Sequence, residues 1–181
     1  MIEVIDNFIT ERQHQNLLSE LSSARFPWYK STILTSGLFK LNPCLNIQFC
    51  HRFVSTTIKM NENEIQRHLV KKSEYSYLID PILDKIEYST ILRIKANCTV
   101  GNPTPKPTGF HIDQGDGDNV KGGFTGIYYV NTCNGYTLFQ DGTKVESVGN
   151  RMLIFDNQMK HSGVACSDNR FRIVINFNWL P

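Results

Sequence analysis

The stretch "FTGIYYVNTCNGYTLFQDGTKVESVGNRMLIFD", residues 124–156, places four short segments between turn residues. The segments are 124–131, 135–140, 143–148 and 151–156, and each is rich in β-branched, aromatic or alternating apolar residues. Glycine, asparagine and aspartate stand between them, as expected for tight turns. Short strands at such spacing are typical of an all-β sandwich or barrel.

Two longer strands are predicted on either side of this stretch. Residues 89–98, "STILRIKANC", alternate in polarity, and residues 170–179, "RFRIVINFNW", do the same near the end of the chain. In the second strand one set of side chains shares a face: Arg170, Arg172, Val174, Asn176 and Asn178. An arginine on the inner face of a barrel needs an anionic partner, because burial of an unpaired guanidinium is costly.

The N-terminal third has a more helical pattern. Helices are expected over 11–26, 63–72 and 77–87, the first capped by Thr10 and the last with Pro81 in its first turn. Residues 27–60 carry no clear pattern. We therefore predict one domain over 1–181 that is mainly β, with helical N-terminal support over about 1–88 and a barrel core over about 89–181.

Composition limits the possible partners and surroundings. The formal net charge is +2, which predicts no strong nucleic-acid footprint. No segment is long and apolar enough to span a membrane, and the start lacks the pattern of a signal peptide. The five cysteines are odd in number and form no C-x-x-C pair, which favours reduced thiols. We expect a cytoplasmic protein.

The stretch "GFHIDQGDGDN", residues 109–119, holds the candidate chemistry. His111 and Asp113 are two positions apart, so in an extended segment both side chains point to the same side. A second histidine would complete a 2-His-1-carboxylate triad, which suits Fe(II) and leaves positions open. His161 is the best candidate, in an expected loop after the strand 151–156. The other histidines, His14, His51 and His68, read as structural or surface residues.

Simpler interpretations stand beside this one. His111 and Asp113 could form a hydrogen-bonded loop pair without a metal, as most isolated H-x-D matches do. Asp116 and Asp118 read as turn formers. Aromatic residues often fill barrels, so Tyr129 could serve core packing alone.

The ordered set H-x-D…H…R resembles the Fe(II)/2-oxoglutarate-dependent dioxygenases. "GFHIDQGDGDNVKGGFTGIYYVN" is similar to the prolyl-hydroxylase branch, "NGYTLFQDG" to its G-x-T-x-F hairpin, and "DNRFRIVINFNW" to the closing strand of small phage-borne members. The resemblance covers roughly residues 90–179. It implies a double-stranded β-helix, or jelly-roll, core of the cupin-like type. It also implies a host-cytoplasmic location if the chain is phage-encoded.

The resemblance further implies the site. His111, Asp113 and His161 would bind Fe(II), and 2-oxoglutarate and O2 would be the cosubstrates, with release of succinate and CO2. Arg172 would pair with the distal carboxylate of 2-oxoglutarate, with Arg170 as the rival on the same face. Tyr129 and Thr137 are further candidates for the 2-oxoglutarate pocket. A carboxylate at 113 favours hydroxylation over halogenation in such enzymes.

The branch-specific "TGIYYVN" implies a protein or peptide substrate, with a peptidyl proline or a similar residue as the hydroxylated group. Two alternatives stay open at this point. One is a dioxygenase that acts on a nucleobase or a small metabolite. The other is a cupin-like barrel that binds metal without turnover.

Overall fold

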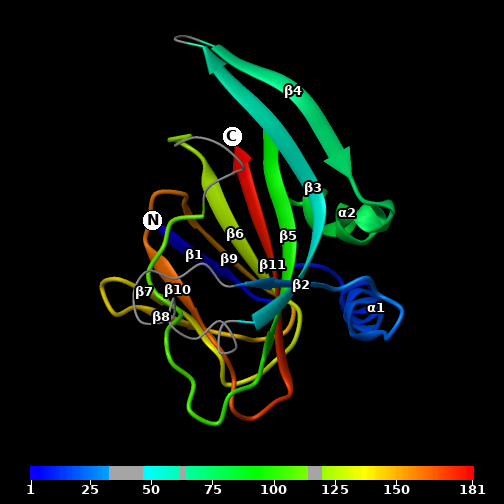
Figure 1. Ribbon diagram of the computed structural model, residues 1–181, viewed down its shortest axis with the longest axis vertical. Coiled ribbons are helices and arrows are strands. Elements are labelled where there is room, and N and C mark those ends of the chain that lie inside the picture. Colours follow the sequence, from blue (N-terminus) through cyan, green and yellow to red (C-terminus); the bar gives the residue numbers. More distant parts are fainter. Residues whose placement is uncertain (33–46, 62–63, 114–119) are drawn as a thin grey trace.

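The computed structural model describes residues 1–32, 47–61, 64–113 and 120–181 (Figure 1). Strands are the main secondary structure of the described residues. In chain order the elements are β1 (Ile2–Ile5), α1 (Glu11–Ser22), β2 (Tyr29–Thr32), β3 (Ile47–Asn61), β4 (Glu64–Lys72), the 3-10 helix η3 (Glu74–Ile79), α2 (Asp80–Leu83), β5 (Thr90–Val100), β6 (Phe124–Tyr129), β7 (Tyr136–Phe139), β8 (Lys144–Glu146), β9 (Arg151–Asp156), β10 (His161–Val164) and β11 (Phe171–Leu180).

The strands form two antiparallel sheets. The large sheet runs in the order β1-β9-β6-β11-β5-β3-β2, with β4 paired to β3, and the small one in the order β10-β7-β8. The segment before the H-x-D pair adds an edge to the small sheet, because Pro107 bridges Val164 and His111 bridges His161. This two-sheet arrangement is the jelly-roll core that the sequence predicted.

The two faces of the large sheet bury different clusters. On the outer face, α1 and the η3–α2 region cover an apolar core that includes Leu17, Leu21, Ile79, Ile82, Ile175 and Phe177 (Figure 1). Between the two sheets lies a second apolar cluster: Ile127, Tyr129, Phe139, Val145, Leu153, Phe155 and Val174. The remainder of that inner space is lined by both polar and apolar side chains and holds the candidate site.

The first helix begins where its sequence predicts, but it ends at Ser22 rather than at the expected residue 26. Thr10 accepts a hydrogen bond from the backbone of Gln13, and the Gln13 side chain accepts one from the Thr10 backbone, which completes a capping box. Leu17 and Leu21 are buried on the inward stripe. Ser23 closes the helix as its C-cap.

The expected helix over 63–72 is wrong. From Glu64 to Lys72 this segment is strand β4, which forms a long hairpin with β3 that projects beyond β5 in Figure 1. Pairing with a neighbouring strand satisfies the backbone of this segment, and that tertiary term outweighs a weak helical propensity. The helix over 77–87 is shorter than expected: a 3-10 helix precedes Pro81, and α2 ends at Leu83.

The N-terminal support is therefore only partly helical. Strand β1 pairs with β9 at one edge of the large sheet, and β3 pairs with β5 on the other side. The unassigned segment 27–60 supplies β2 and β3. Asp116 and Asp118 lie outside the described residues. Within the described part of the chain, no helix has the length and apolar character needed to cross a membrane.

Candidate active site

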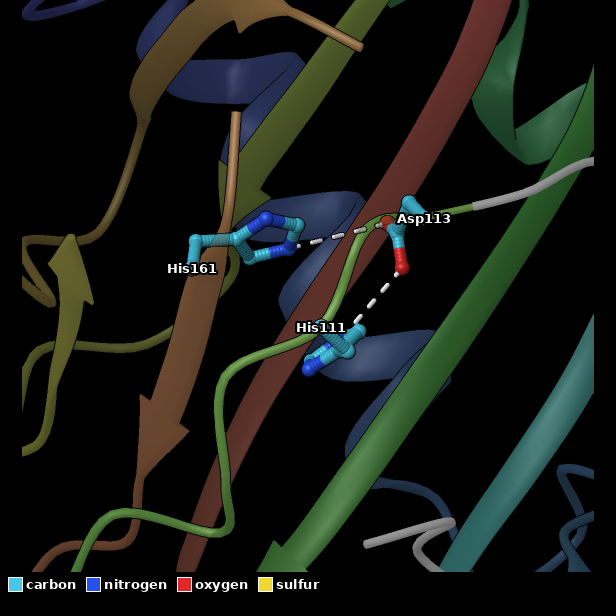
Figure 2. A group of neighbouring side chains, drawn as sticks. All are labelled: His111, Asp113 and His161. Atoms are coloured by element: carbon cyan, nitrogen blue, oxygen red, sulfur yellow. Dashed lines mark ion pairs between the residues drawn. The ribbon is translucent and has the colours of Figure 1, made fainter. Parts of the chain in front are cut away.

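His111, Asp113 and His161 meet at the mouth of the space between the sheets (Figure 2). A pair of backbone hydrogen bonds holds the two histidines opposite each other: His111 N donates to His161 O at 2.9 Å, and His161 N donates to His111 O at 3.0 Å. His161 was expected in a loop, but it is the first residue of β10. Its position is therefore set by the same pairing that places His111.

The side-chain atoms of this triad surround one point. His111 Nε2 lies 3.5 Å from Asp113 Oδ1, and His161 Nε2 lies 4.0 Å from Asp113 Oδ2 (Figure 2). One ligand atom from each residue lies within 4.8 Å of the others. An ion about 2.1 Å from each ligand would separate the ligands by about 3–4 Å, and the two nitrogen–oxygen distances of 3.5 and 4.0 Å are of this size.

The ring orientations agree with a metal site. Nδ1 of His111 hydrogen-bonds the carbonyl of Gly109 at 3.2 Å, and Nδ1 of His161 hydrogen-bonds the carbonyl of Met159 at 3.1 Å. Because carbonyls only accept, both Nδ1 atoms are the protonated donors in the neutral rings. Both Nε2 lone pairs are then directed toward the shared point, as in metal-bound histidines.

Asp113 is held in its ionised form by its surroundings. Burial alone would raise its pKa, but His111, Arg93 and His161 together lower the pKa of Asp113 well below its usual range. Asn176 Nδ2 donates to Asp113 Oδ2 at 2.7 Å, and Arg93 Nη2 lies 3.4 Å from Asp113 Oδ1. Burial lowers the pKa of His161, which keeps that ring neutral. An ionised carboxylate and a neutral imidazole are the forms that bind metal.

A cavity of about 650 Å³ opens from the triad. Arg172 lines it and is only 4% exposed. Its Nε donates to Ser147 Oγ at 2.8 Å and its Nη2 to Thr137 Oγ1 at 3.3 Å. No carboxylate in the described ranges pairs with this guanidinium, and burial lowers the pKa of Arg172. A buried cation with only neutral partners is arranged to receive an anion.

Tyr129 and Thr137 complete the wall around Arg172. The guanidinium carbon lies 5.5 Å from the centre of the Tyr129 ring. Tyr129 donates its hydroxyl hydrogen to Thr137 Oγ1 at 2.8 Å. Thr137 Oγ1 thus links Tyr129 to Arg172, and the Tyr129 hydroxyl also lies 3.4 Å from the carbonyl of Val145. A Cβ at Gly135 would lie 2.6 Å from Arg172 Cδ, so the glycine leaves room for the arginine side chain.

The remaining predicted residues lie elsewhere. Arg170 is exposed, precedes β11 and does not line the cavity. His14 is buried and hydrogen-bonds Tyr128 at 2.8 Å, and His51 hydrogen-bonds Pro27 and Ser73. Neither of these histidines faces the triad, in agreement with their predicted structural roles.

Sequence reasoning missed the residues that hold Asp113. The alternation in "TILRIKANC" puts Arg93, Lys95 and Asn97 on one face of β5, and this face lines the cavity. Asn176 was placed on the polar face of β11 but was given no role. The signal was present in both strands, since polar residues that alternate along a central strand need a polar space to face.

No family profile and no curated protein matches this sequence. Solved structures do match in fold. An oxidoreductase of the 2OG-Fe(II) oxygenase family from Burkholderia pseudomallei has a TM-score of 0.61 at 11% identity, over 98% of this chain and 84% of that chain. A viral collagen prolyl hydroxylase from Paramecium Bursaria Chlorella virus-1 has a TM-score of 0.53 at 15% identity, over 99% and 96% of the two chains.

A third structure is that of a prolyl hydroxylase from Trichoplax adhaerens, in complex with a peptide fragment of the hypoxia inducible factor oxygen degradation domain. Its TM-score is 0.58 at 11% identity, over 98% of this chain and 83% of that chain. These likenesses extend over almost the whole chain, so the N-terminal elements are included. The chain thus has the fold of the 2-oxoglutarate–Fe(II) oxygenases, prolyl hydroxylases among them.

Proposed function

We propose that the protein is an Fe(II)- and 2-oxoglutarate-dependent dioxygenase that hydroxylates an unactivated C–H bond. One observation carries this proposal: His111, Asp113 and His161 share a cavity with the buried guanidinium of Arg172, which has no carboxylate partner among the described residues. A 2-His-1-carboxylate donor set suits Fe(II) and leaves positions open. A buried cation suits a diacid cosubstrate.

Three residues would hold the metal, and others would orient them. The Gly109 and Met159 carbonyls fix the ring tautomers, while Asn176 and Arg93 fix the Asp113 carboxylate. When bound, iron and 2-oxoglutarate supply the activation of O2, with succinate and CO2 as products. The chain supplies orientation and a cavity that shields the reacting groups from solvent in part, which limits side reactions.

Arg172 is our choice to bind the distal carboxylate of 2-oxoglutarate. Its guanidinium is preorganised by Ser147 and Thr137. Tyr129 would support this pocket through Thr137. Arg170 is outside the cavity, and this location speaks against it as the anchor.

For the substrate we propose a peptidyl proline or a similar protein residue. Support comes from the structural neighbours, two of which are prolyl hydroxylases, one of them in complex with a peptide. The near-neutral charge of the chain does not favour nucleic acid. A nucleobase or small-metabolite substrate, and a barrel that binds metal without turnover, are outcomes that the test distinguishes.

The test begins without oxygen. Adding 2-oxoglutarate to the anaerobic Fe(II) protein should produce a charge-transfer absorption band, and His161→Ala should abolish it. On exposure to O2, the wild-type protein should release succinate, and mass spectrometry of proline-containing peptides should show a gain of one oxygen. A folded protein without the band would favour the non-catalytic barrel. Succinate release with no modified peptide would reject the substrate class and leave the chemistry intact.

A further inference from the structure

A second cluster of metal-binding side chains lies outside the cavity. Cys133 is in the loop after β6, and Cys166 and Asp168 are in the loop after β10. One ligand atom from each of these three residues lies within 4.8 Å of the others, and none of the three lines the cavity. Among the described residues this is the one such group besides the triad. The proposed function does not use it.

The spacing of these atoms suits a zinc ion. Zinc binds thiolate sulfur at about 2.3 Å and carboxylate oxygen at about 2.0–2.2 Å, usually in a tetrahedron, so its ligand atoms are about 3.5–4 Å apart. The atoms of Cys133, Cys166 and Asp168 reach this spacing if they approach one another by about 1 Å. Thiolate ligands favour zinc over magnesium and calcium, which prefer oxygen.

Asn134 holds the two loops together at this cluster. Its backbone N donates to both carboxylate oxygens of Asp168, each at 3.0 Å. Its Nδ2 donates to Ser167 Oγ at 2.9 Å, and its Oδ1 accepts from Ser167 N at 2.8 Å. Outer partners of this kind orient metal ligands, and each carboxylate oxygen keeps a further lone pair for an ion. The cluster is therefore preorganised by the chain itself.

The sulfur end of the cluster is protected, and its oxygen end is open. Cys133 and Cys166 are buried, whereas Asp168 is exposed. An ion can thus enter past the carboxylate, and water can take the fourth position on the open side. Burial and the neighbouring Cys133 raise the pKa of Cys166 to about 11. This thiol is protonated at neutral pH, and a metal ion displaces the proton when it binds.

The charge of such a site also suits its surroundings. Arg172 lies beside both loops, because a Cβ at Gly135 would be 2.6 Å from Arg172 Cδ and 2.9 Å from Val164 O. Negative charge on Cys133 and Cys166 favours the charged form of Arg172 and raises its pKa. Two thiolates and one carboxylate around Zn(II) carry one net negative charge. A buried guanidinium nearby stabilises that charge.

We propose that Cys133, Cys166 and Asp168 bind a structural Zn(II) ion, separate from the metal of the proposed active site. The ion joins the loop after β6 to the loop after β10 and stabilises this end of the two-sheet core. These loops flank the stem of Arg172. The proposal goes beyond the proposed function and does not depend on it.

The test uses Co(II) as a probe, because thiolate–Co(II) bonds give a near-ultraviolet charge-transfer band that nitrogen and oxygen ligands do not. The metal-free full chain, kept reduced with a phosphine, is titrated with Co(II). The wild-type protein should bind two ions, one of which produces the band, and Zn(II) should displace that ion. Cys133→Ser and Cys166→Ser should each remove the band and one bound ion. His161→Ala should remove the other ion and retain the band.

Asp168→Asn tests the cluster without a change in the core, since Asp168 is exposed. It should weaken Co(II) binding at the thiolate site about tenfold or more. If either serine variant fails to fold, this variant decides, and an unchanged affinity would overturn the proposal. Cys50→Ser is the matched control, because Cys50 is a half-buried thiol on β3 outside the cluster. It should keep both ions and the band.

Thermal unfolding supplies an independent readout. In the His161→Ala background, Zn(II) should raise the melting temperature, and adding Cys133→Ser should remove that rise. A wild-type protein that binds one ion without the band, or a band that survives both serine variants, would overturn the proposal. Neither result affects the proposed function, which depends on the ion that His161→Ala removes.

Discussion

One face of strand β11 is apolar and packs in the core, whereas the other carries polar side chains that face the candidate site. One face carries Ile173, Ile175, Phe177 and Trp179, all in the apolar core under the helices. The other carries Arg172, Asn176 and Asn178, which face the inner space. Because successive side chains of a strand point to opposite sides, one strand contributes to stability and to the site with different residues. The contribution of β11 to stability and its contribution to the site can therefore be changed separately, by substitutions on one face or the other.

The polar face is buried almost as completely as the apolar one, yet each polar group has a partner. Arg172 donates to Ser147 and Thr137, Asn176 to Asp113, and the amide of Asn178 to Thr125. Buried polar groups without such partners are costly. Substitutions on this face should therefore change ligand binding, and those on the apolar face should change the free energy of unfolding.

The largest expected effect is on the apolar face. Phe177 is fully buried, and Phe177→Ala should lower the free energy of unfolding by about 3–5 kcal/mol through lost burial and a cavity. Urea unfolding measures the loss. The folded fraction should bind metal and 2-oxoglutarate with wild-type affinity. A loss of under about 1 kcal/mol would show that the core can collapse around this site.

The next effect is at the deep guanidinium. Arg172→Met should weaken 2-oxoglutarate binding about 10–100-fold, since hydrogen bonds to charged groups contribute about 1.5–3 kcal/mol. Its free energy of unfolding should stay the same or rise, because the variant replaces a buried charge without a carboxylate partner in the described ranges by an apolar side chain that fills the place of the arginine stem. Calorimetric titration measures the affinity. Arg170→Met is the matched control, and an equal loss there would contradict the assignment of Arg172.

A substitution at Asn176 tests whether the polar face of β11 affects the affinity of the triad for the metal. Asn176→Ala removes the donor to Asp113, and metal affinity should fall about 10–100-fold, as for other outer partners of metal ligands. Competition with a chelator measures the metal affinity. Asn178→Ala provides the comparison and should cause a smaller loss, because Asn178 contacts no residue of the triad: its amide nitrogen donates to Thr125, and its oxygen accepts from Arg93, which in turn lies beside Asp113. Equal losses in the two variants would mean that the effect is a general loosening of the strand.

The smallest expected effect returns to the apolar face. Ile175 is fully buried, and Ile175→Val should cost about 0.5–1.5 kcal/mol of unfolding free energy. Metal and 2-oxoglutarate affinities should not change. Thermal unfolding and titration on the same samples check both statements. A shift in metal affinity would show that strain passes between the two faces of β11, against the separation proposed above.

Much of the fold could be predicted locally. The structure contains the strands that were predicted from sequence patterns. They lie within 89–98, 124–156 and 170–179. The predicted helix over 63–72 was wrong because local sequence does not decide the conformation of this segment. That segment has a mixed pattern, and its pairing with β3 decides its conformation. The same holds for β1, whose partner β9 lies far along the chain.

The sequence by itself determined the chemical types of the site: two imidazoles, one carboxylate and an arginine on the polar side of an alternating strand. Only the tertiary structure decided that His161 faces His111 across a backbone bridge, that Arg172 is buried while Arg170 is exposed, and that Asn176 donates to Asp113. The reason is physical. Periodicity is a property of neighbouring residues, whereas strand register depends on contacts between residues far apart in the chain.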